Sequence, residues 1–164
     1  MTAAEEVFLD DVTPPKFSRA GSEVRTPSHR DEMQPDKFAA LFLSLVRFIG
    51  AGYAHGDAEC WEAAHRCAEE AVGPIDGPLF VARAAGLVRA VRRRRDPDLA
   101  YLPWSCLRLS SDEAKLMLLI GAARATDMRA LERAASDLLG GGRGAETIQA
   151  ANELANLCRR PAAR

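Results

Sequence analysis

The sequence predicts an all-α protein: a compact five- or six-helix bundle domain over residues 36–164, behind a disordered or extended N-terminal arm over residues 1–35. Two observations carry this prediction. From Asp36 onward, apolar residues recur at intervals of three and four in successive stretches, which is the spacing of amphipathic helices. Strand formers are scarce, and β-branched residues never alternate with polar ones over a useful length. A chain of 164 residues fits one domain of this kind.

The N-terminal arm lacks a sustained apolar period, and four prolines interrupt it among Ser, Thr, Arg and Asp. Such a segment buries too little apolar surface to offset the entropy of ordering it. One stretch differs, because three apolar residues stand between pairs of acidic ones and a fourth follows directly. These four residues are Val7, Phe8, Leu9 and Val12. Two interpretations stay open: this stretch packs locally on the protein's own body, or it is a short linear motif that docks into a partner's groove.

Three helices are predicted in the first half of the body. The first has one broad apolar stripe and is expected to end near Gly50 and Gly52. The stripe consists of Phe38, Leu41, Phe42, Leu45, Val46, Ile49 and Tyr53. The second helix begins at Asp57, a good N-cap residue, and ends at Gly73-Pro74. The third opens with Asp76-Gly77-Pro78, since proline in the first turn loses no hydrogen bond.

The stretch from Pro97 to Leu109 is the least regular part of the body. Pro97 and Pro103 prevent one continuous helix through it. It is nevertheless too apolar to hang in solvent, with Tyr101 and Trp104 among several leucines. We therefore expect its aromatic side chains to plug one end of the helical core.

Three further helices are predicted after this stretch. Ser110 and Glu113 have the spacing of a capping box, and the apolar run behind them predicts a central fourth helix. That helix turns at Thr126-Asp127 into a fifth, which Gly140-Gly141-Gly142 ends. A sixth helix is expected from about Ala145.

Composition bounds the function classes. The formal net charge of −1 gives no field that would attract nucleic acid or an acidic membrane to the whole protein. No run approaches the roughly eighteen apolar residues of a spanning helix, and the acidic start does not resemble a secretory signal. The four cysteines, Cys60, Cys67, Cys106 and Cys158, form no CxxC pair and are expected to be reduced. We expect a cytoplasmic protein, and its arginine and alanine bias suggests a GC-rich bacterial genome.

The histidines supply the few candidates for chemistry. His65 stands four residues before Glu69, so the two can meet on one helix face. A metal site or a general base would need partners that the sequence does not show. Phosphotransfer on His65 is another alternative, but Ala68 and Glu69 stand where a lysine and a glycine would be expected. No catalytic residue, metal ligand or cofactor is predicted, and whether the protein is an enzyme stays open, with a non-enzymatic role favoured.

A cluster of arginines marks the end of the third predicted helix. It consists of Arg83, Arg89, Arg92, Arg93, Arg94 and Arg95. One interpretation is a solvated helix end that pairs with Asp96 and Asp98 and complements the helix dipole. The alternatives are a contact with nucleic acid or phosphate, or with an acidic partner protein.

The leading functional hypothesis is a non-enzymatic cytoplasmic accessory or regulatory protein. It would bind another protein, or itself, through its helical surface and the motif around Phe8. The alternative is a nucleic-acid-binding regulator that uses the arginine cluster. A third hypothesis is an enzyme or phosphotransfer protein built on His65.

Overall fold

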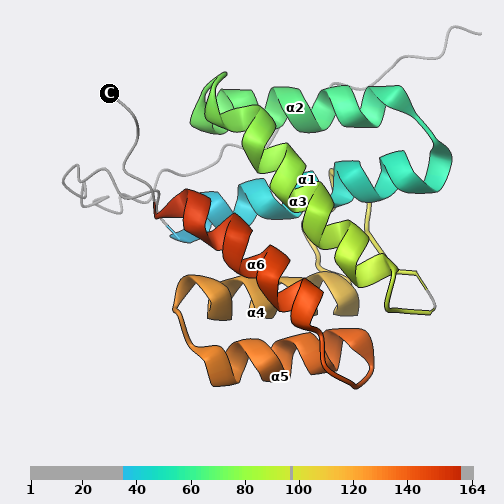
Figure 1. The fold of residues 1–164 in the computed structure, drawn as a ribbon. Helices are drawn as coiled ribbons and strands as arrows, with labels where there is room; N and C mark the ends of the chain where they lie inside the picture. Colours follow the sequence, from blue (N-terminus) through green and yellow to red (C-terminus); the bar gives the residue numbers. More distant parts are fainter. Residues whose placement is uncertain (1–34, 97, 160–164) are drawn as a thin grey trace, which may run out of the picture. The chain divides into compact units, whose positions relative to one another are not determined.

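The computed structural model describes residues 35–96 and 98–159, and within them it contains six α-helices and no strand (Figure 1). The all-α bundle predicted from the sequence is thereby confirmed. The predictions for the N-terminal arm, including Val7, Phe8, Leu9 and Val12, lie outside the described residues. The helices are α1 (Pro35–His55), α2 (Ala58–Val72), α3 (Asp76–Arg92), α4 (Ser111–Arg124), α5 (Met128–Leu139) and α6 (Ala145–Cys158).

Two helix pairs and two bridging helices make up the bundle. α1 packs on α2, and α4 packs on α5. α3 packs against both helices of the first pair, and α6 packs against both α3 and α4 (Figure 1). α3 and α6 pack on each other, and through this contact they join the two helix pairs around one apolar core.

The helix ends follow the predicted capping signals. The Asp57 carboxylate accepts the N–H of Glu59 at 2.8 Å at the start of α2. Ser110 and Glu113 form the predicted capping box of α4. At the end of α5, Gly140 has φ 71°, a left-handed conformation that glycine adopts without steric cost.

One predicted end was wrong, because α1 continues through Gly50 and Gly52 to His55. These glycines serve close packing instead. A Cβ on Gly50 would lie 2.5 Å from Cε2 of Tyr101, and one on Gly52 would lie 2.6 Å from Nε1 of Trp61. Their lack of a side chain lets two aromatic rings rest on the backbone of α1.

The core is built from one face of each helix. Leu45, Ile49, Leu87, Leu119 and Leu154 are among its fully buried side chains. α4 was expected to be central, and Leu116, Leu119 and Ile120 are buried, but Leu118 of the same apolar run is 68 % exposed.

α1 is also apolar and long enough, over Lys37–His55, to cross a membrane by length and composition alone. The sequence was expected to hold no stretch of this kind, but α1 meets both criteria. Half of its most apolar window is buried inside the bundle, where α1 packs on α2 and α3. That is the arrangement of a core helix.

Candidate functional site

Residues 98–110 connect α3 to α4 without forming a helix, and we call them the connecting segment. Its aromatic side chains were expected to plug the core, and this holds for Tyr101, which packs against the core, but was wrong for Trp104. Leu99 is buried, but Trp104 is 70 % exposed and Leu107 is 102 % exposed. Leu109 is also 48 % exposed. The segment therefore turns three of its large apolar side chains, Trp104, Leu107 and Leu109, toward solvent.

The connecting segment is held by a buried arginine of α1. Arg47 is only 4 % exposed, yet all five of its N–H groups have acceptors. Two of them donate to the carboxylate of Glu113, at 2.8 and 3.0 Å. The others donate to backbone carbonyls of the segment: Cys106 and Arg108, each at 2.6 Å, and Trp104 at 3.4 Å.

Glu113 completes this buried ion pair from the first turn of α4. Besides Arg47, it accepts the backbone N–H groups of Leu102 at 3.0 Å and of Ser110 at 2.8 Å. Burial alone would raise the pKa of Glu113, but these three donors outweigh it and hold the pKa below its ordinary value. The carboxylate is therefore charged near neutral pH, with every lone pair occupied.

The ion pair of Arg47 and Glu113 explains why the backbone of the segment faces the protein while Trp104 and Leu107 face solvent. It hydrogen-bonds the backbone of every second residue from Leu102 to Ser110, so the backbone faces inward. Polar backbone that is buried must find partners, and here a charged pair supplies them. The side chains of Trp104 and Leu107 project outward from a backbone held by these hydrogen bonds.

A second ion pair fixes the start of the segment. Arg95 lies 2.8 Å from the carboxylate of Asp112, which also accepts the N–H of Ala100 at 2.9 Å. The Ser110 hydroxyl donates to the carbonyl of Ala100 at 2.6 Å. The connecting segment is therefore tied down at both ends and along its middle.

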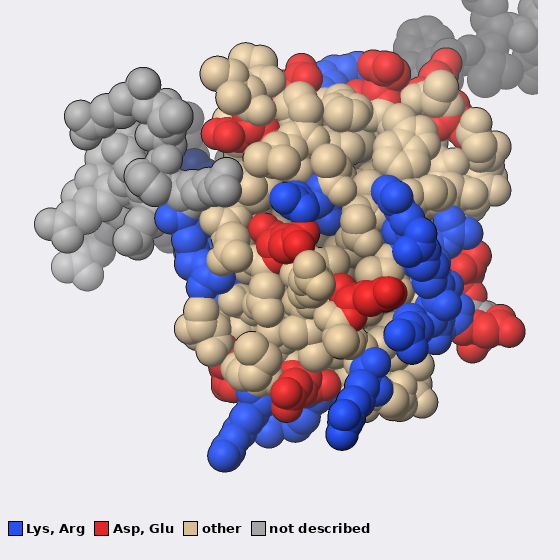
Figure 2. Space-filling view, viewed as in Figure 1, with Lys and Arg blue, Asp and Glu red and all other residues tan. Residues whose placement is uncertain are grey.

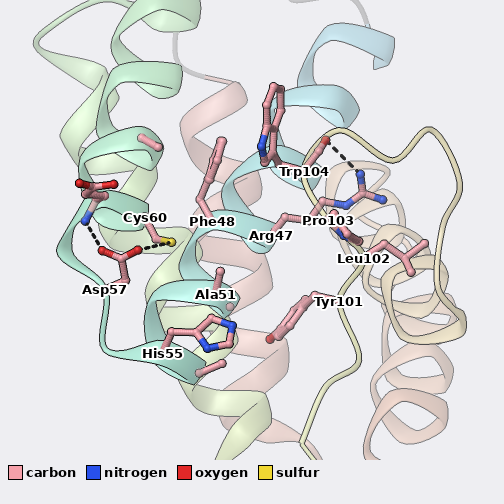
Figure 3. A pocket seen from close by; sticks show the side chains of 14 residues that line it. Arg47, Phe48, Ala51, His55, Asp57, Cys60, Tyr101, Leu102, Pro103 and Trp104 are labelled. Atoms are coloured by element: carbon pink, nitrogen blue, oxygen red, sulfur yellow. Dashed lines mark hydrogen bonds between the residues drawn. The ribbon is translucent and has the colours of Figure 1, made fainter.

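A groove of about 500 Å³ lies between the connecting segment, α1 and α2 (Figure 3). Its size is within the range of natural binding sites, roughly 300–1,000 Å³. Its walls are mainly apolar: Phe48, Ala51, Ala54, Ala63, Leu102, Pro103 and Trp104. At one end the rings of Phe48 and Trp104 lie nearly parallel, with their centroids 6.3 Å apart and 25° between their planes.

The polar side of the groove comes from the start of α2. Asp57 and Glu59 line it, together with His55 at the end of α1 and Cys60. The Cys60 thiol lies 3.7 Å from the Asp57 carboxylate (Figure 3). Burial and the nearby carboxylate of Asp57 raise the pKa of this thiol, which makes Cys60 a poor nucleophile.

Tyr101 borders the groove, but its hydroxyl is buried and has no hydrogen-bond partner within the described residues. Burial also raises the pKa of this phenol. We expect Tyr101→Phe to leave the free energy of unfolding unchanged or to raise it by up to about 1 kcal/mol, because an unpaired buried hydroxyl costs free energy. Urea denaturation would measure this change. A loss above about 1 kcal/mol would show that the hydroxyl has a partner.

The arginine cluster is divided by the fold. Three of its members are paired: Arg83 with Glu153, Arg92 with Asp98, and Arg95 with Asp112. Arg89, Arg93 and Arg94 are exposed. The pairing with Asp98 that the sequence suggested is confirmed for Arg92, which also lies 4.9 Å above the ring of Tyr53.

The exposed arginines share their surface with acids. Arg89 and Arg93 line a shallow depression between α3 and α6, and Glu146 and Glu153 line the same depression. Figure 2 shows basic and acidic side chains interleaved on this face. A mixed surface of this kind attracts phosphate weakly, since carboxylates repel it.

His65 does not belong to the groove. It is half-buried on α2, and no hydrogen bond or ion pair joins it to Glu69 among the residues described. Within the same residues, no group of three His, Cys, Asp or Glu side chains is placed to hold a metal ion.

The sequence contained a signal for this site that we did not use. Arg47 interrupts the longest apolar stretch of α1, and a charge at such a position needs a buried partner. Phe48, Ala51 and His55 share a face of α1 outside the predicted stripe. A second apolar face on one helix indicates a second contact surface.

Comparison with protein-family models, with curated proteins and with solved structures finds no match for this chain.

Proposed function

We propose that this protein is a non-enzymatic binding protein, and that it captures an apolar segment of another protein in the groove beside the connecting segment. One observation carries the proposal: the buried pair of Arg47 and Glu113 fixes the backbone, while Trp104 and Leu107 project outward. A scattered exposed leucine is ordinary on a protein surface. Several large apolar side chains on one rigid segment beside an apolar groove are typical of an interface.

The chemistry of the groove supports the same proposal. Exposed aromatic side chains, tryptophan above all, dominate the binding energy of protein interfaces. The pair of Phe48 and Trp104 offers such a surface, and a partner's aromatic or leucine side chain would stack on it. Holding Trp104 in place before binding reduces the entropy lost when the complex forms.

The sequence also offered two other candidate binding sites, the motif around Phe8 and the arginine cluster. The motif around Phe8 is still a predicted docking motif, and no described residue bears on it. The arginine cluster supports nucleic-acid binding less than its sequence suggested, because three of its six members are paired with acids.

Trp104→Ala is the substitution that tests the groove. Peptides would first be selected for binding to the wild-type protein from a random displayed library, and their affinities would be measured by fluorescence anisotropy. We expect Trp104→Ala to weaken the selected peptides about 30-fold, since a central aromatic residue of an interface contributes about 2 kcal/mol.

Leu118→Ser is the matched control, because Leu118 is 68 % exposed on α4 and does not line the groove. It should leave peptide affinity unchanged. Circular dichroism would establish that both variants are folded. If Trp104→Ala bound every selected peptide as tightly as the wild type does, the groove would not be the binding site.

A further inference from the structure

Besides Arg47, the charged side chains that line the groove come from the start of α2 and are acidic. Asp57 and Glu59 line the groove, and Glu62 is exposed one turn further along the same helix. None of these three carboxylates has a basic partner within the residues that the structure describes. Within the same residues, the carboxylate of Asp57 accepts only the N–H of Glu59 and the thiol of Cys60.

The arginine that lines the groove does not neutralise these three carboxylates. Arg47 borders the groove, but its guanidinium is neutralised by Glu113 and its five donors are all used. His55 is the other basic residue of the wall. Arg108 is exposed on the connecting segment but does not line the groove. The groove therefore has a mainly apolar lining, which we call its floor. Asp57, Glu59 and Glu62 form an acidic rim beside it at the start of α2.

We infer that the partner is a basic-apolar peptide segment: one large apolar side chain that enters between α1 and the connecting segment, flanked by Lys or Arg that face the rim of α2. This inference rests on the proposed function and names the kind of partner the groove takes. The apolar anchor supplies most of the affinity, because the rim carboxylates are exposed and each exposed ion pair contributes little. The rim supplies selectivity and a faster association rate, both of which weaken with salt.

The same charges argue against the protein's own acidic-apolar motif as the occupant. That motif has the apolar side chain the floor requires, in Phe8, but it carries Glu5, Glu6, Asp10 and Asp11 around it. Seating it in the groove would bring these acids to the rim carboxylates, and like charges at an interface disfavour binding.

The peptides selected on the wild-type protein provide the test. We expect peptides whose binding depends on Trp104 to combine an aromatic or leucine residue with Lys or Arg. The triple variant Asp57→Asn/Glu59→Gln/Glu62→Gln should bind them about tenfold more weakly at low salt, and about equally at 1 M salt, where charges are screened. Asparagine keeps the N-cap of α2, so the helix start is preserved.

Glu132→Gln/Asp137→Asn is the matched control, because it removes two exposed acids from α5, away from the groove. It should leave the affinity and the salt dependence unchanged. Replacing Lys and Arg by Gln in the peptide itself should reproduce the loss seen with the triple variant.

Three results would overturn the inference, and they differ from one another. Peptides that need Trp104 but are neutral or acidic would refute the basic partner and leave the proposed groove standing. Peptides that ignore Trp104, or no selected peptides at all, would refute the groove and the inference together. If the wild type sedimented as a dimer and Trp104→Ala as a monomer, the occupant would be a second copy of this chain.

Discussion

Glu113→Gln is expected to lower the free energy of unfolding by about 3–5 kcal/mol, the usual cost of breaking a buried ion pair by removing one partner. Glutamine keeps the shape of the side chain but leaves the charge of Arg47 buried and uncompensated. Arg47 is 4 % exposed and Glu113 is fully buried, so water cannot replace the lost interaction. Urea denaturation followed by circular dichroism would measure the change.

The exposed pair of Arg83 and Glu153 is the internal control for this prediction. Its side chains are 45 % and 38 % exposed, so Glu153→Gln should change the free energy of unfolding by less than about 1 kcal/mol. The double variant Arg47→Met/Glu113→Gln should be less destabilised than the sum of its single variants, because no unpaired charge stays in the core. Equal small losses for Glu113→Gln and Glu153→Gln would contradict the role given to the buried pair.

The same pair predicts a dependence of stability on pH. Burial would raise both pKa values, but Arg47 and two backbone N–H groups hold the pKa of Glu113 below its ordinary value of 4.5, and the Ala100 N–H and Arg95 lower that of Asp112. Each group binds protons more weakly when folded, so its stabilisation is complete above the unfolded pKa and is lost as pH falls through the folded pKa. The wild type should therefore lose stability below about pH 4, and Glu113→Gln should lose less over the same range.

The ion pair of Arg47 and Glu113 holds the connecting segment, so breaking it should also loosen the wall of the groove that this segment forms. Under conditions where Glu113→Gln is still folded, it should bind the selected peptides more weakly than the wild type does, because Trp104 is no longer held before binding. Hydrogen exchange of the N–H groups of Leu102 and Ser110, which donate to Glu113, would report the loosening directly.

The helices could be predicted from the sequence because their signals are local. A cap such as Asp57 or Ser110 acts within three residues, and a stop such as Gly140 acts within one turn. Apolar periodicity likewise needs only the residues of one helix. These patterns placed the starts of α2, α4 and α5 correctly.

The site could not be predicted in the same way, because it depends on contacts between distant residues. Arg47 and Glu113 are 66 positions apart, and Glu113 was already explained by the capping box that it also forms. The connecting segment is apolar, and apolarity alone predicts burial. The hydrogen bonds from Arg47 to the backbone of the segment bury that backbone instead and leave Trp104 facing solvent. The glycines of α1 misled for the same reason, since their partners come from elsewhere in the chain.

Gly77 shows how far such close packing determines stability, and Gly77→Ala should be strongly destabilising. Gly77 is buried in the first turn of α3, where an added Cβ would lie 2.8 Å from the backbone nitrogen of Glu69 and 2.9 Å from its Cα. These atoms belong to the backbone of α2 and cannot rotate away. We expect a loss of about 1–3 kcal/mol from overpacking, reduced somewhat by the better helix propensity of alanine.

Gly86→Ala is the matched control, because Gly86 lies in the middle of the same helix and an added Cβ would have no atom within 4 Å. There the propensity of alanine acts alone and should raise the free energy of unfolding by about 0.5–1 kcal/mol. The two substitutions are chemically identical, so opposite signs in urea denaturation would assign the difference to the contact between α2 and α3. A stabilising Gly77→Ala would mean that these two helices separate at little cost.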